Sequence, residues 1–338
     1  MISPSMKHLR YFEALSRHGH FGRAAEECAV TQPALSVQIK ELEALIGAPL
    51  VERGARHIHL TSLGKEFAER AQEILQSVNE LGELARASRG PLMGELRIGV
   101  IPTVAPYLLP AVIKALASHY PGLDLRPREA VTAKLITALM EARLDTAIVA
   151  LPISEPMLRE VPLFEEEFLL ARAAQDADKP VPKPEKLKEM RLLLLEEGHC
   201  FREQALSYCS LDNAVPRDLM EGSSLSTLVQ MVGAGIGVTL IPEMAVHIET
   251  RSADVALARL PEPRPTRSIG MVWRRTNPLS DQLAKVAGIV RKVGLERKAV
   301  VGTTSRSAVV PGEEPGSETR NLSLARDSGS RFMDARPE

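Results

Sequence analysis

Cysteine is scarce in this chain, with three cysteines among 338 residues. A small, odd number does not fit the dense, even framework of a secreted disulfide scaffold, so we expect any cysteine pairing to be regulatory rather than structural. The chain also lacks a run of ~20 apolar residues, the length that crosses a bilayer, and residues 1–10 lack the basic start and apolar core of a secretory signal. We therefore expect no membrane association and a cytoplasmic location.

A strong excess of charge of one sign is also missing, because the formal net charge is -1 at pH 7. This balance argues against a generally basic coat, so any DNA binding must rest on local basic residues. Apolar residues make up 44% of the chain and charged residues 25%, which is close to globular averages and allows packed cores. The length predicts two or three domains. We predict neither a metal nor a cofactor.

Four helices are predicted before residue 90, over 7–17, 22–28, 32–46 and 62–87, with an interruption near 47–60. The second and third helices are short and separated by only three residues, and Ala24 and Ala25 are small enough to let them cross closely. This pattern is typical of a helix-turn-helix, although spacing alone leaves ordinary packing of two helices equally open. Met6 is an alternative start of the protein.

The start of the third helix carries short polar side chains where a recognition helix meets DNA. Glutamine pairs well with adenine, and a lysine on this helix suits a phosphate. The arginines of the interruption resemble a wing that touches phosphates or the minor groove. The predicted DNA-binding residues are Thr31, Gln32, Pro33, Ser36, Gln38, Lys40, Arg53 and Arg56.

The fourth helix has an apolar seam along its length. Its members recur at alternating steps of four and three: Phe67, Ala71, Ile74, Val78, Leu81 and Ala85. A seam of ~40 Å favours a second helix from another copy of the chain, hence a dimer. Packing of this helix onto its own domain is the alternative.

From Gly94 onward, short apolar strands alternate with helices, which predicts parallel sheet with crossover helices in two α/β halves. The last helix is expected over 279–293. Residues 302–338 are rich in Ser, Gly, Pro, Arg and Glu, and have too few large apolar residues to offset the entropy of ordering. We expect a disordered tail there.

Cys200 and Cys209 lie nine positions apart. If the residues between them are helical, their Cα atoms are ~13 Å apart, about twice the limit for a disulfide. Pairing would therefore require this helix to unfold, which gives two states. Cys200 is expected to begin the helix, where the amides and the neighbouring Arg202 favour the thiolate. On spacing alone, two cysteines that merely fill small buried sites remain the favoured alternative; we read Cys28 in this way.

The N-terminal motifs resemble those of LysR-type transcriptional regulators. The residues that carry this resemblance are His20-Phe21-Gly22-Arg23-Ala24-Ala25, Thr31-Gln32-Pro33-Ala34-Leu35-Ser36, Glu52-Arg53 and Leu60-Thr61-Ser62-Leu63-Gly64. The resemblance implies a winged helix-turn-helix over 6–64, a dimerising linker helix over 65–90, and a two-lobed α/β, periplasmic-binding-protein-like sensor domain over 94–298. Residues 299–338 fall beyond it as the tail. The family usually assembles as a tetramer.

Two further segments resemble the peroxide-sensing branch of this family. They are 101–110, which contains Ile101-Pro102-Thr103-Val104, and 192–209, which contains Leu195-Glu196-Glu197-Gly198-His199-Cys200. The resemblance implies that Cys200 is the thiol attacked by peroxide and that Cys209 resolves it. It also implies that Thr103 and His199, and more weakly Thr132 and Arg267, position peroxide. From the residues alone, Thr103 could equally cap a helix, and Arg267 could form a surface salt bridge at a strand edge.

The resemblance therefore implies a transcription regulator, mainly an activator of oxidative-stress genes, that is switched by hydrogen peroxide. Its expected partners are promoter DNA, RNA polymerase, further copies of the chain and a glutaredoxin-like thiol reductant. A regulator of the same architecture that binds a small metabolite in the cleft, with inert cysteines, is the alternative. An enzyme with a His199-Cys200 nucleophile is disfavoured, because adjacent residues at a helix start point apart and no acidic residue orients the histidine.

Overall fold

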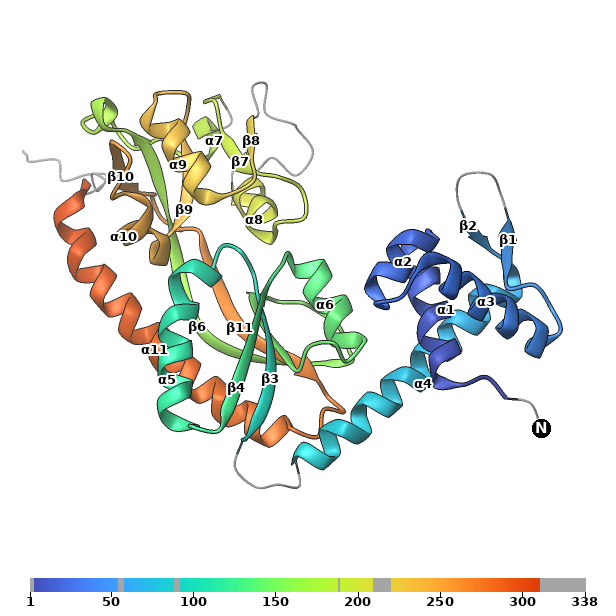
Figure 1. The fold of residues 1–338 in the computed structure, drawn as a ribbon. Helices are drawn as coiled ribbons and strands as arrows, with labels where there is room; N and C mark the ends of the chain where they lie inside the picture. The colour runs from blue at the N-terminus through green and yellow to red at the C-terminus, as the bar shows by residue number, and fades with distance from the viewer. Residues whose placement is uncertain (1–2, 54–57, 88–91, 188, 209–219, 311–338) are drawn as a thin grey trace, which may run out of the picture.

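The structure, a computed structural model, describes residues 3–53, 58–87, 92–187, 189–208 and 220–310 (Figure 1). Its N-terminal helices and the sheets of the larger C-terminal part are joined by one long helix. No helix within the described ranges is long and apolar enough to cross a membrane.

The first domain is a winged helix-turn-helix, as predicted. Its elements are α1 (Met6–His18), α2 (Phe21–Glu27), α3 (Gln32–Ile46), β1 (Val51–Arg53) and β2 (Ile58–Leu60). Side-chain caps define the helix starts: Ser5 accepts the amide of His8, and Thr31 accepts that of Ala34. The antiparallel strands β1 and β2 form the wing, and Phe12, Leu35 and other apolar side chains fill the core.

The linker helix α4 (Ser62–Ala87) is anchored to α1 and to the segment that leads into the wing. The Thr61 hydroxyl accepts the amide of Gly64 and donates to the carbonyl of Pro49. A Cβ on Gly64 would lie 2.0 Å from the backbone oxygen of Leu50, so only glycine allows this approach. The Phe67 ring meets Phe12 edge to face, with ring centroids 5.4 Å apart. The start of α4 is therefore part of the first domain.

The first lobe of the sensor domain has the predicted parallel sheet. Strand β3 (Gly94–Val100) lies between β4 (Leu123–Glu129) and β5 (Thr146–Leu151), and pairs with both in parallel. The crossover helices are α5 (Ala105–His119) and α6 (Thr132–Met140). A continuous apolar core lies between these layers.

Two long strands run from the first lobe into the second. Strand β6 (Leu158–Ala173) pairs antiparallel with β11 (Thr266–Arg274), and its second half pairs with β9 (Thr239–Pro242) and β10 (Val255–Arg259). The sheet order is β12-β10-β6-β11-β5-β3-β4, with β9 beside β6. The sequence pattern gave no prediction for β6, because acidic residues interrupt its apolar run.

The second lobe has its own apolar core. Its elements are η1 (Ala174–Asp176), α7 (Pro184–Leu187), β7 (Leu193–Leu195), α8 (Cys200–Tyr208), β8 (Met220–Gly222), α9 (Leu225–Gly233), η2 (Glu243–Ala245) and α10 (Val246–Glu249), besides β9 and β10. Strands β7 and β8 form a small parallel sheet. Some side chains cross between the lobes: Cys200 and Met244 pack against the core of the first lobe, and Tyr107 belongs to the core of the second.

The C-terminal helix is longer than predicted. Helix α11 (Ser280–Ala308) continues beyond 293, and β12 (Val309–Val310) then pairs in parallel with β10. The expected end of the last helix and the start of the tail at 299 are therefore wrong. Beyond 293, Gly294 packs directly against the Phe164 ring and Lys298 Nζ donates to the Glu165 carbonyl at 2.7 Å, so contacts with strand β6 accompany the extension of this helix. Residues 311–338 lie outside the described residues.

Candidate functional site

A cleft of about 960 Å³ opens between α6 of the first lobe and α8 of the second. Figure 1 shows both helices on the side of the sensor domain that faces the N-terminal helices. The cleft walls include Thr132, Ile136, Leu151, Cys200, Gln204 and Thr266. The lining combines apolar side chains with a few polar groups, as is usual for a small-molecule site.

Cys200 occupies the N-terminal end of α8, as predicted. Gly198 precedes it with φ = 91°, a conformation that favours glycine and turns the chain into the helix. The thiol is free and half-buried, and it lines the cleft. Cys200 therefore has the accessibility that a reaction with a small molecule requires.

Two polar atoms in the cleft have unmet hydrogen-bonding capacity. Thr132 Oγ1 and Gln204 Oε1 are buried and have no hydrogen-bond partner within the described part of the chain. Both residues line the cleft together with Cys200. Because a buried polar atom without a partner costs free energy, a small molecule that donates and accepts hydrogen bonds would be favoured here.

Two neighbours of Cys200 in the sequence, His199 and Arg202, carry ionisable side chains that differ in charge and in hydrogen-bond partners. Burial lowers the pKa of His199, although Glu196 and Glu129 act in the opposite direction, so the neutral imidazole is favoured. Arg202, which we expected to favour the thiolate, donates instead to the Leu195 carbonyl and to the carboxylate of Glu221. Arg202 therefore acts on Cys200 less strongly than we predicted, because its positive charge is already paired with the carboxylate of Glu221.

Thr103 and Arg267 meet in a buried contact behind the cleft. Arg267 Nη1 donates to Thr103 Oγ1 at 2.8 Å, and Nη2 donates to the Thr103 carbonyl at 3.1 Å. Both alternatives for these residues are wrong: Val104 is the cap residue of α5, without a side-chain cap, and the Arg267 side chain is fully buried. Neither residue is among those that line the cleft. Contact of either with peroxide stays a prediction.

Aromatic rings enclose the same guanidinium. Arg267 Cζ lies 5.8 Å from the ring centroid of Phe168 and 5.7 Å from that of Phe201, and the two rings meet edge to face. The Glu166 carboxylate accepts a hydrogen bond from Arg267 Nε at 2.8 Å. This buried cluster joins the strands of the hinge to the residue directly after Cys200.

Sequence reasoning assigned no role to Glu166 or Gln204. A signal for Glu166 exists in hindsight: it has the same parity as Phe164 and Phe168 on a strand, so its side chain points inward with theirs. An acidic residue at an inward position requires a charged partner. No comparable pattern marks Gln204, because its exposure to the cleft depends on how α8 packs.

Cys209 lies outside the described residues. Helix α8 extends from Cys200 to Tyr208, a rise of roughly 12 Å at 1.5 Å per residue. The helical conformation that we predicted for this segment is therefore confirmed as far as Tyr208.

The polar residues at the start of α3 face outward. Thr31, Gln32, Pro33 and Lys40 are exposed, and Ser36 is half-buried. The side chains of Thr31 and Gln38 also have internal partners, since Thr31 caps the helix and Gln38 donates to Glu41. Arg53 ends β1, opposite Ile58 on β2, while Arg56 lies outside the described residues.

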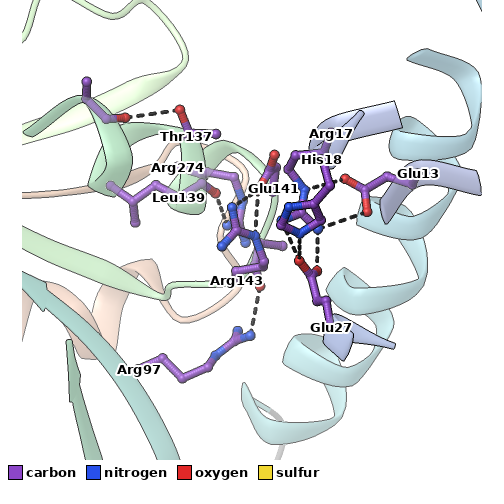
Figure 2. A network of polar contacts seen from close by, with 12 residues as sticks. Glu13, Arg17, His18, Glu27, Arg97, Thr137, Leu139, Glu141, Arg143 and Arg274 are labelled. Carbon is purple, nitrogen blue, oxygen red and sulfur yellow. Dashed lines mark hydrogen bonds and ion pairs between the residues drawn. The ribbon is translucent and has the colours of Figure 1, made fainter. Parts of the chain in front are cut away.

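Ion pairs hold the helix-turn-helix together behind this surface. Figure 2 shows Arg17 of α1 reaching the carboxylates of Glu13 and Glu27, with the His18 ring also on Glu27. Arg17 lowers the pKa of Glu27 to about 2 through its hydrogen bond, and His18 acts in the same direction. The adjacent Cys28 thiol is half-buried, and burial raises its pKa. Cys28 is thus less suited to nucleophilic attack.

The apolar seam of α4 is covered only at its start. Phe67 packs against the core of the first domain and Ala71 is fully buried, whereas Ile74, Val78 and Leu81 are 46%, 37% and 64% exposed. The alternative to a dimer is that this helix packs onto its own domain instead of onto a second copy. Among the described residues of the seam, such packing is found only in the first turns of the helix. The remaining seam presents apolar side chains at helical spacing.

Two sequence profiles of known families match the chain. One, described as "Bacterial regulatory helix-turn-helix protein, lysR family", matches residues 6–65, and the other, "LysR substrate binding domain", matches residues 89–294. The probable hydrogen peroxide-inducible genes activator of Streptomyces viridosporus is 40% identical over 294 residues, which cover 86% of this chain and 94% of that protein. The DNA-binding transcriptional dual regulator OxyR of Escherichia coli is 38% identical over 289 residues, which cover 85% of this chain and 95% of that protein.

Solved structures agree with these relatives. A full-length OxyR variant from Pseudomonas aeruginosa is 35% identical, with a TM-score of 0.64, and the match covers 85% of this chain and 94% of that one. A hydrogen peroxide-bound OxyR mutant from Corynebacterium glutamicum is 31% identical, with a TM-score of 0.61, and the match covers 90% of this chain and 96% of that one.

Proposed function

The chain belongs to the LysR family of helix-turn-helix regulators, in its OxyR branch, and we propose that it is a DNA-binding activator of oxidative-stress genes that hydrogen peroxide switches through Cys200. The observation that carries this proposal is the placement of a free, half-buried thiol at a helix N-terminus inside the cleft. The protein acts in the cytoplasm as a regulator and not as an enzyme, because its cysteine reacts to change state rather than to turn over a substrate.

The first chemical step is attack by the Cys200 thiolate on one oxygen of hydrogen peroxide. The S–O bond forms as the O–O bond breaks, and the leaving hydroxide takes a proton to become water. Thr132 Oγ1 and Gln204 Oε1 are the cleft atoms with free capacity to hold the peroxide. His199, favoured as the neutral form, can donate a hydrogen bond from one ring nitrogen and accept one at the other.

In the second step the Cys209 thiol attacks the sulfenic sulfur, which forms the S–S bond and releases water. Because Cys200 and Tyr208 bracket a helix, these sulfurs meet only after the segment refolds. Phe201, whose side chain is fully buried in the core of the second lobe, leaves its site in that event. A dithiol reductant of the glutaredoxin class returns two electrons and restores the reduced state.

The DNA-binding side of the proposal rests on α3 and the wing. In this proposal Gln32 and Ser36 contact base edges and Lys40 contacts a phosphate. The wing arginines Arg53 and Arg56 contact phosphate or the minor groove, and Thr31, Pro33 and Gln38 are the remaining DNA contacts. The exposed seam of α4 pairs with that of a second copy, and dimers join into a tetramer. Refolding at Cys200 changes the spacing of the recognition helices on promoter DNA, and thereby the contact with RNA polymerase.

One observation favours a second candidate. A cleft of about 960 Å³ is far larger than a peroxide molecule, and its volume suits a small metabolite. Under this alternative, the cysteines are inert and a metabolite closes the lobes.

Replacement of Cys200 by Ser separates the two candidates. We expect Cys200→Ser to abolish the peroxide-dependent change in a promoter footprint while the reduced footprint stays unchanged. Cys28→Ser is the matched control and keeps the response, because the Cys28 thiol lies in the DNA-binding domain. A Cys200→Ser protein that still responds to peroxide would contradict the proposal and favour the metabolite.

A further inference from the structure

Glu166 is a buried carboxylate that lies outside the cleft yet is connected to it. Its side chain is 2% exposed on strand β6. Both oxygens are engaged: Oε1 accepts from Arg267 Nε at 2.8 Å and pairs with Nη2 at 2.7 Å, and Oε2 accepts the amide of Met244 at 3.1 Å. Glu166 therefore fixes the plane of the Arg267 guanidinium from one side and holds it against the η2 turn.

The other side of the guanidinium makes the contacts that reach the reacting cysteine. It donates twice to Thr103, in the loop between β3 and α5. It also lies over the ring of Phe201, which follows Cys200 directly in α8. One planar cation thus connects a hinge strand, the loop at Thr103 and the start of the helix that carries the thiol.

From these contacts we propose that Glu166 is a positioning residue for the reaction of Cys200 with peroxide. It acts through Arg267, by keeping the guanidinium in the plane that fixes both Thr103 and the Phe201 ring. The inference rests on the proposed function. Without the carboxylate, Arg267 would keep its charge in a buried site and reorient towards other acceptors, which would displace Thr103 and the first turn of α8.

The structure provides a matched control in the first lobe. Asp145 is fully buried and accepts from Arg97 Nε at 3.2 Å, from Nη2 at 2.7 Å and from the Arg97 amide at 2.7 Å. Like Glu166, it therefore binds a guanidinium and a backbone amide. Asp145 precedes β5 and is not among the residues that line the cleft. Neutralisation of either acid removes a buried carboxylate. The arginine partner of Glu166 lies over the ring of the residue after Cys200, whereas the arginine partner of Asp145 donates to the Ala142 carbonyl within the first lobe.

The test measures the rate constant for Cys200 oxidation by peroxide in the full-length reduced protein, with quenched thiol labelling as the readout. We expect Glu166→Gln to lower this rate constant by about tenfold or more, because small displacements of reacting groups have effects of that order. Glu166→Asp, which keeps the charge, should restore part of the rate. Asp145→Asn should change it by less than about twofold, as expected for distant sites.

A second reagent separates positioning from general loosening of the fold. Alkylation of Cys200 by iodoacetamide needs an accessible thiolate, as oxidation does, but none of the contacts that position peroxide. We expect Glu166→Gln to slow oxidation far more than alkylation. Equal slowing of both reactions, or an Asp145→Asn effect as large as that of Glu166→Gln, would overturn the inference.

Two outcomes keep this inference distinct from the proposed function. If Cys200 of the unmodified protein does not react with peroxide, the proposed function fails. If Cys200 of the unmodified protein reacts with peroxide and Cys200 of Glu166→Gln reacts at the same rate, only the inference fails. Should Glu166→Gln not fold, Phe201→Leu replaces it: this variant keeps all charges and an apolar side chain but removes the ring beside Arg267. Unchanged oxidation in both Phe201→Leu and Glu166→Asp would overturn the inference.

Discussion

The DNA-binding domain and the sensing cleft are held together over very different sequence distances. In the first domain, Thr31 caps the amide three residues later, and Arg17 pairs with Glu27 ten residues away. Around the cleft, Arg267 contacts Glu166 at a separation of 101 residues and Thr103 at a separation of 164. The functional surface of the first domain is thus defined locally and is exposed, whereas the chemistry of the cleft depends on buried contacts between distant segments.

The largest effect is expected on the free energy of unfolding when one arginine is replaced in each region. Arg267→Gln leaves Glu166 buried without its partner and should lower the free energy of unfolding of the sensor domain by roughly 3–5 kcal/mol. Arg17→Gln removes the ion pairs with Glu13 and Glu27, in which the arginine side chain is 26% exposed and the carboxylate side chains are 20% and 39% exposed. Each of these pairs should contribute less than about 1 kcal/mol. Urea unfolding, followed by hydrogen exchange in each domain, measures the loss of stability in both variants. Equal losses in Arg267→Gln and Arg17→Gln would contradict the difference between the two regions.

The exposed apolar seam of α4 should stabilise a dimer between two copies of the chain. Leu81→Ala removes one apolar side chain from each protomer and should weaken the dimer by about 3 kcal/mol in total, since each buried leucine contributes roughly 1.5 kcal/mol. Sedimentation equilibrium measures the change. Glu73→Gln, in an exposed ion pair with Arg70 on the same helix, is the control and should leave the dimer intact. A Leu81→Ala protein that dimerises normally would show that the seam has another partner.

Two substitutions in the recognition helix α3 should distinguish recognition of base pairs from electrostatic binding to the DNA backbone. Gln32→Ala should cost roughly 1–3 kcal/mol of discrimination at a contacted base pair. Lys40→Ala should instead weaken binding to all sequences and reduce the salt dependence of binding by about one phosphate contact. Titrations against specific and random DNA at several salt concentrations test both. Identical behaviour of the two variants would contradict their assigned roles.

The smallest effect is a pH dependence confined to the first domain. Because the pKa of Glu27 falls from 4.5 to about 2 on folding, its ion pair stabilises the domain above pH 4.5. This contribution is lost as the pH falls from 4.5 towards 2. Its size should stay below about 1 kcal/mol, because solvent screens the partly exposed pair. Glu27→Gln should remove this part of the pH dependence in acid unfolding experiments.

The same difference in contact range explains what the sequence could predict. The helices of the first domain follow from caps and periodicity: Thr31 starts α3, and Gly47 ends it in the left-handed conformation. The start of α8 at Cys200 was predicted from its sequence neighbours in the same way. The inward position of Glu166 on a strand could have signalled a buried charge, but its pairing with Arg267 and the role of Phe201 could not be predicted, because both depend on strand β6 crossing between the lobes. Likewise, Arg202 was expected to act on Cys200, but Glu221 on β8 pairs with it.

The central claim is that peroxide oxidises Cys200 and that the segment up to Cys209 then refolds. The most direct test is mass spectrometry of all three cysteines in the full-length protein before and after micromolar peroxide. We predict a Cys200–Cys209 disulfide, a free Cys28, and a sulfenic acid at Cys200 when Cys209 is replaced by Ser. Three free thiols after peroxide treatment would contradict the account.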